Sequence, residues 1–504
     1  MMKWKITVGV LVAIAAICVL IFRNEPETEP YLQINYATFL GGSDNDRAHG
    51  LAVDKDGNLY IVAPIQSNDF PITSDALVKE PTGIYLARIN PAGDLTYATY
   101  LGVPGGANYA HDIAIDQKGC VYVVGNTTNP DFPVTAGAFQ TTFRGPSDRS
   151  HGDAFVMKLS PDCLQVIYTT FIGGSGMDLA GKIAVDRDGC AYILGTTSSV
   201  DLPVTEGAFD ASFNGGGGDG RDDLFIAKLD PAGSKLLYCT YLGGSKTDLH
   251  GDNLVIDKTG SVVFAGTTAS EDFPTTKNAF DRDYNGGSAM HGRGDAILVK
   301  LDPMGSKLEF SSFLGGSGED CASNLAVDNK GYIWMAGETN SSDFPITKDA
   351  RQQEIRGGVD GFFAQLDLRD GKLLYASLLG GLGDDDLTIA THASGMIVLT
   401  GRTDSPDFPV TVSSRIPQIG NVDTFVSLVD SETSQLKDSR VMGGSGHESI
   451  SAMICRGDSI YLVGNTASPD FPVTANAWDN TFNGGSNPWG GDALVIKLTL
   501  GGKR

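Results

Sequence analysis

The tripeptide Asp-Phe-Pro recurs along the chain at a nearly constant interval, and this repetition limits the folds that the chain can adopt. Seven copies lie 62 to 71 residues apart, one of them with leucine in place of phenylalanine. Their prolines are Pro71, Pro133, Pro203, Pro274, Pro345, Pro409 and Pro472. Self-similarity at a fixed period indicates a fold built from repeated supersecondary units.

A second motif, with two adjacent glycines and an acidic residue shortly after them, keeps the same period. It begins at Phe39, Phe171, Tyr241, Phe313, Leu378 and Val441, and the copy at Tyr100 is degenerate. One complete unit contains four short apolar runs, in the third unit "KIAVD", "CAYILG", "LFIAKL" and "KLLYCTYLGG". Four antiparallel strands repeated radially are typical of a β-propeller. The sequence therefore predicts an all-β, seven-bladed propeller with four strands in each blade.

The two ends of the repeat region predict how the ring closes. The last unit contains a third strand in "DALVIKL" but no fourth, whereas an unmatched fourth strand lies at "YLQINYATFLGG", residues 31–42. We expect this N-terminal strand to complete the last blade, because closure removes an open sheet edge.

The runs "YATFLGG", "GLAVDKDGNLYIV" and "NDFPIT" carry a family resemblance. Together they resemble the SBBP-type bacterial β-propeller repeat, and the similarity extends over nearly all of residues 31–504. The resemblance implies a propeller in a protein that is exported or attached to the cell surface. It implies no catalytic residues, because no catalytic motif comes with it.

The first thirty residues differ from the repeats. A short basic segment, residues 1–5, precedes a largely apolar run, residues 6–22, and an acidic linker, residues 23–30. The run is near the lower limit for a membrane-spanning helix, and its basic flank favours a cytoplasmic N-terminus. We expect an uncleaved signal anchor, with a cleaved signal peptide as the alternative. The propeller, residues 31–504, is then membrane-anchored outside the cytoplasm, in the periplasm or at the cell surface.

The net charge and the cysteine content limit the classes of partner and the kinds of site that the chain can have. The net charge of −24 disfavours binding to nucleic acid, because such a surface repels phosphate backbones. Six cysteines follow the apolar segment without a CxxC motif, which argues against zinc ribbons and thioredoxin-like sites. Cys120 and Cys190 occupy the same turn in successive units, and Cys163 lies in another turn on that face. A disulfide from Cys163 to Cys120 or Cys190 is therefore a testable expectation.

Two sets of carboxylates recur with the units. The aspartate in turns such as "VDRDG" fits a structural turn better than a calcium loop, because the EF-hand spacing is missing. The second set follows the glycine pair and comprises Asp46, Asp178, Asp248, Asp320, Asp385 and Glu448, with Ala107 in the degenerate unit. These side chains either accept backbone N–H bonds between blades or form an acidic ring at the channel mouth. Such a ring would hold a cation or attract a basic ligand.

The glycine-pair loops and the long Asp-Phe-Pro connections should share one face of the propeller, called the loop face. Six of the seven histidines fall on it: His49, His111, His151, His250, His291 and His447. They show no HxH or HExxH spacing, so no metal ligands are assigned. The aromatic residues of the long connections, Phe143, Phe213, Tyr284 and Trp489, either form a recognition rim or hold their own loops to the blades.

These features predict a binding or scaffolding module that uses the loop face. The candidate binding residues are His49, His111, His250, Asp46, Asp178, Asp248, Asp320, Phe213, Tyr284 and Trp489. The partners would be the membrane, through the N-terminal helix, and an extracytoplasmic protein or glycan, and we expect a monomer. No cofactor is expected, and a divalent cation has no support from the sequence. The alternative is a lyase or hydrolase that acts on polysaccharide with His and Asp at the channel mouth.

Overall fold

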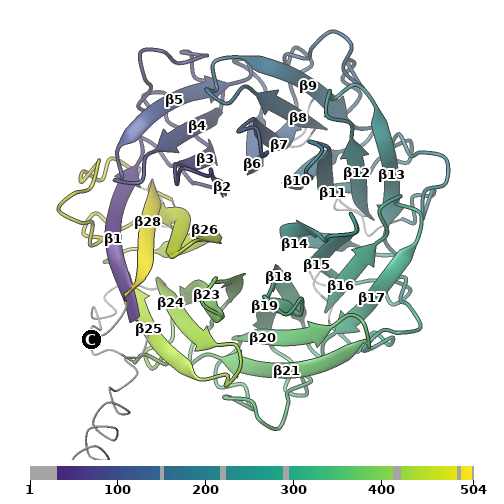
Figure 1. Cartoon of the computed structure of the whole chain (residues 1–504), viewed down its shortest axis with the longest axis vertical. Helices are drawn as coiled ribbons and strands as arrows, with labels where there is room; N and C mark the ends of the chain where they lie inside the picture. The colour runs from purple at the N-terminus through teal and green to yellow at the C-terminus, as the bar shows by residue number, and fades with distance from the viewer. Residues whose placement is uncertain are drawn as a thin grey trace, which may run out of the picture.

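The computed structural model describes residues 31–147, 152–215, 223–287, 294–411, 422–484 and 490–501. In these ranges the chain forms seven four-stranded antiparallel sheets, arranged as blades around a central opening (Figure 1). The predicted seven-bladed propeller is therefore confirmed. The expected segments 1–5, 6–22 and 23–30 lie outside the described residues. Among the described residues, no helix has the length and apolarity needed to cross a membrane.

The strands fall into four concentric shells. The first strands, nearest the centre, are β2 (Gly50–Val53), β6 (Asn108–Ile115), β10 (Asp178–Val185), β14 (Asp248–Ile256), β18 (Asp320–Val327), β22 (Thr388–Thr391) and β26 (Glu448–Arg456). The second strands are β3 (Leu59–Pro64), β7 (Val121–Thr127), β11 (Ala191–Thr197), β15 (Val262–Thr268), β19 (Ile333–Thr339), β23 (Met396–Thr403) and β27 (Ser459–Thr466).

The third and fourth strands complete each blade towards the outside. The third strands are β4 (Ile84–Ile89), β8 (Asp153–Leu159), β12 (Asp223–Leu229), β16 (Asp295–Leu301), β20 (Asp360–Asp367), β24 (Asp423–Asp430) and β28 (Asp492–Gly501). The outer strands are β5 (Leu95–Leu101), β9 (Val166–Ile172), β13 (Leu236–Leu242), β17 (Leu308–Leu314), β21 (Lys372–Leu379), β25 (Leu436–Met442) and β1 (Tyr31–Leu40).

The ring closes through the N-terminal strand, as the sequence predicts. Strand β1 pairs antiparallel with β28, with Tyr31 opposite Gly501 and Leu40 opposite Ala493. The backbone N–H of Leu32 also donates to Asp438 Oδ2 of the neighbouring blade, at 2.8 Å. The last blade therefore contains both the first and the last strand of the described chain (Figure 1).

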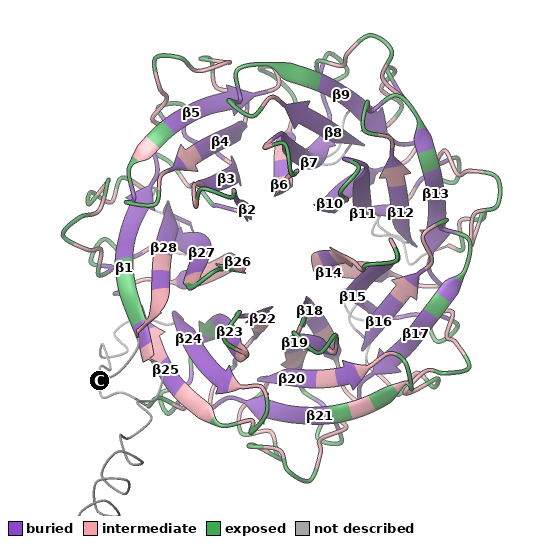
Figure 2. Ribbon diagram, viewed as in Figure 1, coloured by how far each residue is buried: buried purple, intermediate pink, exposed green. Residues whose placement is uncertain are grey.

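The hydrophobic core lies between the blades, and both faces of the middle strands are buried (Figure 2). In β11, Ile193 packs in a cluster shared with the preceding blade, whereas Tyr192 packs in a cluster shared with the following blade. Successive side chains of a strand point to opposite faces, so an uninterrupted apolar strand can contact two neighbours at once. This explains why the middle strands lack polar alternation.

The turn that contains Asp186 is structural. Asp186 Oδ1 accepts hydrogen bonds from the backbone N–H groups of Asp188 and Cys190, at 3.0 and 2.9 Å. Gly189 has φ of 87°, a conformation that glycine adopts without steric cost. The carboxylate is therefore used to stabilise its own turn, in agreement with the structural interpretation of this motif.

Candidate functional site

The first strands carry β-bulges that point side chains into the centre of the ring. Register shifts between Ala110 and Asp112, Ala180 and Lys182, Ala322 and Asn324, and Ile450 and Ala452 leave one extra residue in each of four strands. The extra residues are His111, Gly181, Ser323 and Ser451. A bulge re-aims a side chain and is frequent next to functional sites. All four residues line one central cavity on the loop face.

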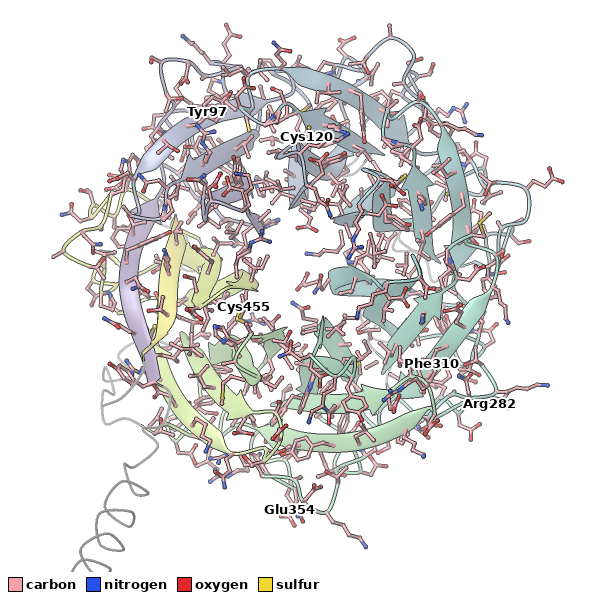
Figure 3. All side chains as sticks on the ribbon, viewed as in Figure 1. Tyr97, Cys120, Arg282, Phe310, Glu354 and Cys455 are labelled. Atoms are coloured by element: carbon pink, nitrogen blue, oxygen red, sulfur yellow. The ribbon has the colours of Figure 1, made fainter. Side chains whose placement is uncertain are left out.

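This cavity, called the channel mouth, has a volume of about 460 Å³ and is lined by residues of all seven blades, most of them in or just before the first strands. Cys455, on β26, lies near the centre of the ring, whereas Glu354 and Arg282 lie at its outer edge (Figure 3). The histidines His49, His111 and His250 line one part of the channel mouth, and Ser323, Thr388, Ser449 and Ser451 line another. A second cavity of about 280 Å³ continues along the channel, and Lys182 and Asp252 line both.

Three histidines that the sequence placed on the loop face are brought together here. The rings of His49 and His111 are stacked, with centroids 6.0 Å apart. His111 Nε2 lies 2.7 Å from Asn126 Oδ1, and His250 Nδ1 lies 2.9 Å from the carbonyl oxygen of Gly251. The His250 ring covers Gly181, where a Cβ atom would lie only 2.0 Å from His250 Nε2. Glycine in β10 therefore makes room for this imidazole.

The imidazoles of His49 and His111 are uncharged at neutral pH. Burial lowers the pKa of His49 to about 4, and the positive charges of Lys182 and Arg47 act in the same direction. Burial also lowers the pKa of His111 to about 3, although its hydrogen bond to Asn126 opposes this change. Both rings therefore offer neutral donor and acceptor groups to the channel mouth.

Two ion pairs lie among these polar groups. Lys182 Nζ is 3.1 Å from Asp252 Oδ1, and Arg402 lies 2.5 Å from Asp386 Oδ2. Lys182 is thus paired with a carboxylate of the next blade, on β14, and Arg402 with a carboxylate of its own blade, just before β22. These four residues were not predicted from the sequence. Their positions in the sequence could have indicated them, because each residue lies either close to a recurring carboxylate or near the end of a second strand.

The recurring carboxylates do not form the acidic ring considered from the sequence. Asp46, Asp178, Asp248 and Asp320 are fully buried. Each accepts a hydrogen bond from the second glycine of the preceding pair, for example Gly174 N to Asp178 Oδ2 at 2.9 Å. In the degenerate unit the equivalent position is Asn108, at the start of β6, and not Ala107. The geometry therefore supports the interpretation in which these carboxylates accept hydrogen bonds from backbone N–H groups.

The aromatic residues of the long connections hold their loops to the blades. Phe213 packs against Tyr241 and Tyr284 packs against Phe313, with ring centroids 6.1 and 6.0 Å apart. Phe143 packs against Phe171 in the same way. These rings are half-buried, so they do not form the exposed recognition rim that was considered. Trp489, His151 and His291 lie outside the described residues.

Cys120, Cys163 and Cys190 are free thiols. Cys163, Cys120 and Cys190 are buried in three different hydrophobic clusters, so the expected disulfide is not formed. Among the described residues, no group of three or more His, Cys, Asp or Glu side chains is arranged to hold a metal ion.

The SBBP family model, described as a beta-propeller repeat, matches residues 35–71 and 96–133. The regulatory protein FlaEY of Caulobacter vibrioides is 23% identical over 405 residues, which cover 74% of this chain and 38% of FlaEY. This chain therefore spans well under two thirds of the length of that relative.

Several solved structures match most of this chain at low sequence identity. A Dyadobacter fermentans protein of unknown function has a TM-score of 0.44 at 9% identity, and the match covers 93% of this chain and 99% of that one. Hydrazine synthase of Kuenenia stuttgartiensis has a TM-score of 0.44 at 12% identity, covering 86% and 95%. The polysaccharide lyase Uly1 has a TM-score of 0.46 at 10% identity, covering 94% and 100%. Such distant similarity says nothing about function.

The resemblance noted in the sequence is confirmed at two of the units: this chain carries SBBP beta-propeller repeats.

Proposed function

We propose that this protein is an exported, membrane-anchored propeller that binds a polar ligand in the channel mouth. The supporting observation is that the channel mouth is asymmetric in an otherwise repetitive fold. Framework positions carry the same residue type in most blades, whereas the bulge positions carry His111, Gly181, Ser323 and Ser451. A purely structural role would favour repetition, so this variation indicates a surface shaped for one asymmetric ligand.

The charges of the channel mouth favour an uncharged ligand. Lys182 and Arg402 are each paired with a carboxylate, and the His49 and His111 imidazoles are neutral. The net charge of −24 further disfavours the approach of a polyanion. Hydroxyl, imidazole, amide and paired ionic groups can together donate to and accept from sugar hydroxyls. A neutral glycan therefore fits the channel mouth better than an acidic one.

Binding can be tested by calorimetric titration of the full chain with neutral oligosaccharides and, in parallel, with oligogalacturonate. His111→Ala and Arg402→Ala should each weaken binding of the neutral sugar about tenfold or more, because each removes a hydrogen-bonding group from the cavity. Lys118→Ala is a matched control, since this exposed residue follows the strand of His111 on the opposite face. Equal affinity of all three variants would place the ligand elsewhere, and preference for oligogalacturonate would contradict the neutral class.

A lyase or hydrolase that acts on polysaccharide is the second candidate. It is supported by the cluster of uncharged imidazoles, because a neutral imidazole can accept a proton. However, the low pKa values of His49 and His111 make these rings weak bases at neutral pH, which favours binding over catalysis. Product analysis after prolonged incubation separates the two candidates. A bound sugar recovered unchanged supports a binding module, whereas cleavage that is lost in His111→Ala supports an enzyme.

A further inference from the structure

Buried carboxylates meet in pairs at six junctions between blades. One member begins the third strand of a blade, and the other is the recurring carboxylate of the next blade. The pairs are Asp153 with Asp178, Asp223 with Asp248, Asp295 with Asp320, Asp360 with Asp385, Asp423 with Glu448, and Asp492 with Asp46. A glycine marks the contact: a Cβ atom at Gly173 would lie 2.7 Å from Asp153 Oδ1 and 2.8 Å from Asp178 Oδ2.

The hydrogen bonds of the first pair leave one oxygen without a donor. Asp153 Oδ2 accepts from Arg144 N at 2.8 Å, whereas Asp153 Oδ1 is buried and has no partner among the described residues. Asp178 Oδ2 accepts from Gly174 N and from Ser199 Oγ, at 2.9 and 2.8 Å. A buried, ionised oxygen without a donor is unfavourable, and a second carboxylate beside it makes ionisation of both still less favourable.

The remaining junction provides an internal control. Between the first and second blades, Ile84 begins the third strand and Asn108 takes the place of the recurring carboxylate. Both acids are therefore missing at the same junction. The Asn108 amide donates to the carbonyl oxygen of Thr82 at 2.8 Å. At the junction where no acid begins the third strand, the position of the recurring carboxylate thus carries a neutral amide, which has N–H donors of its own.

We propose that each of the six carboxylate pairs holds one shared proton in the folded protein, so that the propeller binds protons as it forms. In the first pair, Asp153 and Asp178 would hold this proton between them, since Asp153 Oδ1 and Asp178 Oδ2 both face Gly173. The pKa values agree with this geometry, since burial raises that of Asp153 to about 6 and that of Asp178 to about 7. Burial and the neighbouring Glu448 carboxylate raise the pKa of Asp423 to about 7.

The groups that face the first pair do not titrate with it. The charge of Arg144, in the loop before β8, lowers the pKa of Asp153 but does not outweigh burial. Hydrogen bonds from Ser175 lower the pKa of Asp201, so that Asp201 remains ionised. Cys239 and Tyr241 approach from β13, and burial raises the pKa of both, so they stay neutral. The pair is therefore the group that changes charge near neutral pH at this junction.

The test compares the full chain with Asp178→Asn, which reproduces the amide of the natural Asn108 junction. Wild-type stability should increase as the pH is lowered from about 8 to about 5, because the folded state binds more protons than the unfolded state. Asp178→Asn should bind one proton fewer on folding, which removes about a tenfold change in the folding equilibrium per pH unit across this window. Asp188→Asn, on an exposed turn of the same blade, is the control and should retain the wild-type pH dependence.

Two results would overturn the proposal. One is an unchanged pH dependence in Asp178→Asn. The other is a loss of stability on addition of EDTA, which would mean that a metal ion bridges the carboxylates. If Asp178→Asn does not fold, infrared spectra of the wild-type chain decide the question. A protonated-carboxyl C=O band should persist in the folded protein at about pH 6, and its absence would refute the shared protons.

Discussion

Replacement of Leu40 by alanine should destabilise the whole propeller, because this residue lies in the strand that closes the ring. The strand β1 is packed between two neighbours. Tyr36 and Leu40 face a cluster shared with the first blade, whereas Leu32, Ala37 and Phe39 face a cluster shared with the sixth. The Leu40 side chain is completely buried. Its truncation therefore weakens the junction at which the two ends of the chain meet.

The expected loss follows from the burial. A buried Leu→Ala change typically costs about 3 to 5 kcal/mol, since the lost transfer energy adds to the cost of the cavity. Ile34 is the matched control on the same strand, because its side chain is 38% exposed. Ile34→Ala should cost about 0.5 kcal/mol or less, as is usual for surface positions.

Chemical denaturation followed by intrinsic fluorescence measures both variants against the full wild-type chain. A single transition that moves to lower denaturant for Leu40→Ala, with little change for Ile34→Ala, supports cooperative closure. Equal effects of the two substitutions would refute the reasoning, because burial would then not determine the cost. A separate early transition in Leu40→Ala would show that β1 detaches without opening the ring.

Three further predictions concern the channel and the thiols. Gly181→Ala should displace the His250 ring, visible as a shift of its imidazole NMR signal, and an unchanged signal would contradict the packing of His250 over Gly181. His49 and His111 should stay uncharged down to about pH 5 in an NMR titration; their lowered pKa values mean that stability is lost as the pH falls below the unfolded value, opposite in sign to the carboxylate pairs. The Cys163 thiol, whose pKa burial raises to about 12, should resist maleimide labelling in the folded protein, and rapid labelling would contradict its burial.

The architecture was predictable because it depends on local, repeated signals. Glycines at turns and the Asp-Phe-Pro motif mark the same points in each unit, so the number of blades and the closure by residues 31–42 follow from counting. The pairing of β1 with β28 confirms the predicted closure of the ring. The repetition of these motifs thus predicts which distant segments pair, which the sequence of a single unit does not show.

The site was predictable only in part. His49, His111 and His250 were placed on the correct face, but Lys182 was missed, because the extra residue in the bulge before it changes the direction of the side chains that follow. Arg402 was missed as well, because it belongs to a second strand, which was not expected to line the channel. The recurring carboxylates were counted correctly, yet their burial depends on partners from other strands. Ser199, for example, donates to Asp178, and an equivalent serine precedes most Asp-Phe-Pro motifs. The joint recurrence of this serine and the carboxylate could have predicted that the carboxylates are buried.

The placement of β1 in the last blade has an evolutionary consequence. Because the ring closes with one strand from the N-terminal end, each sequence repeat contributes an outer strand to one blade and three strands to the next. Every repeat is thus a covalent link across a blade junction. Duplication or loss of a repeat would add or remove one link and still leave matching ends. Propellers of this type can therefore change their number of blades by recombination at any repeat boundary, without a new closing strand.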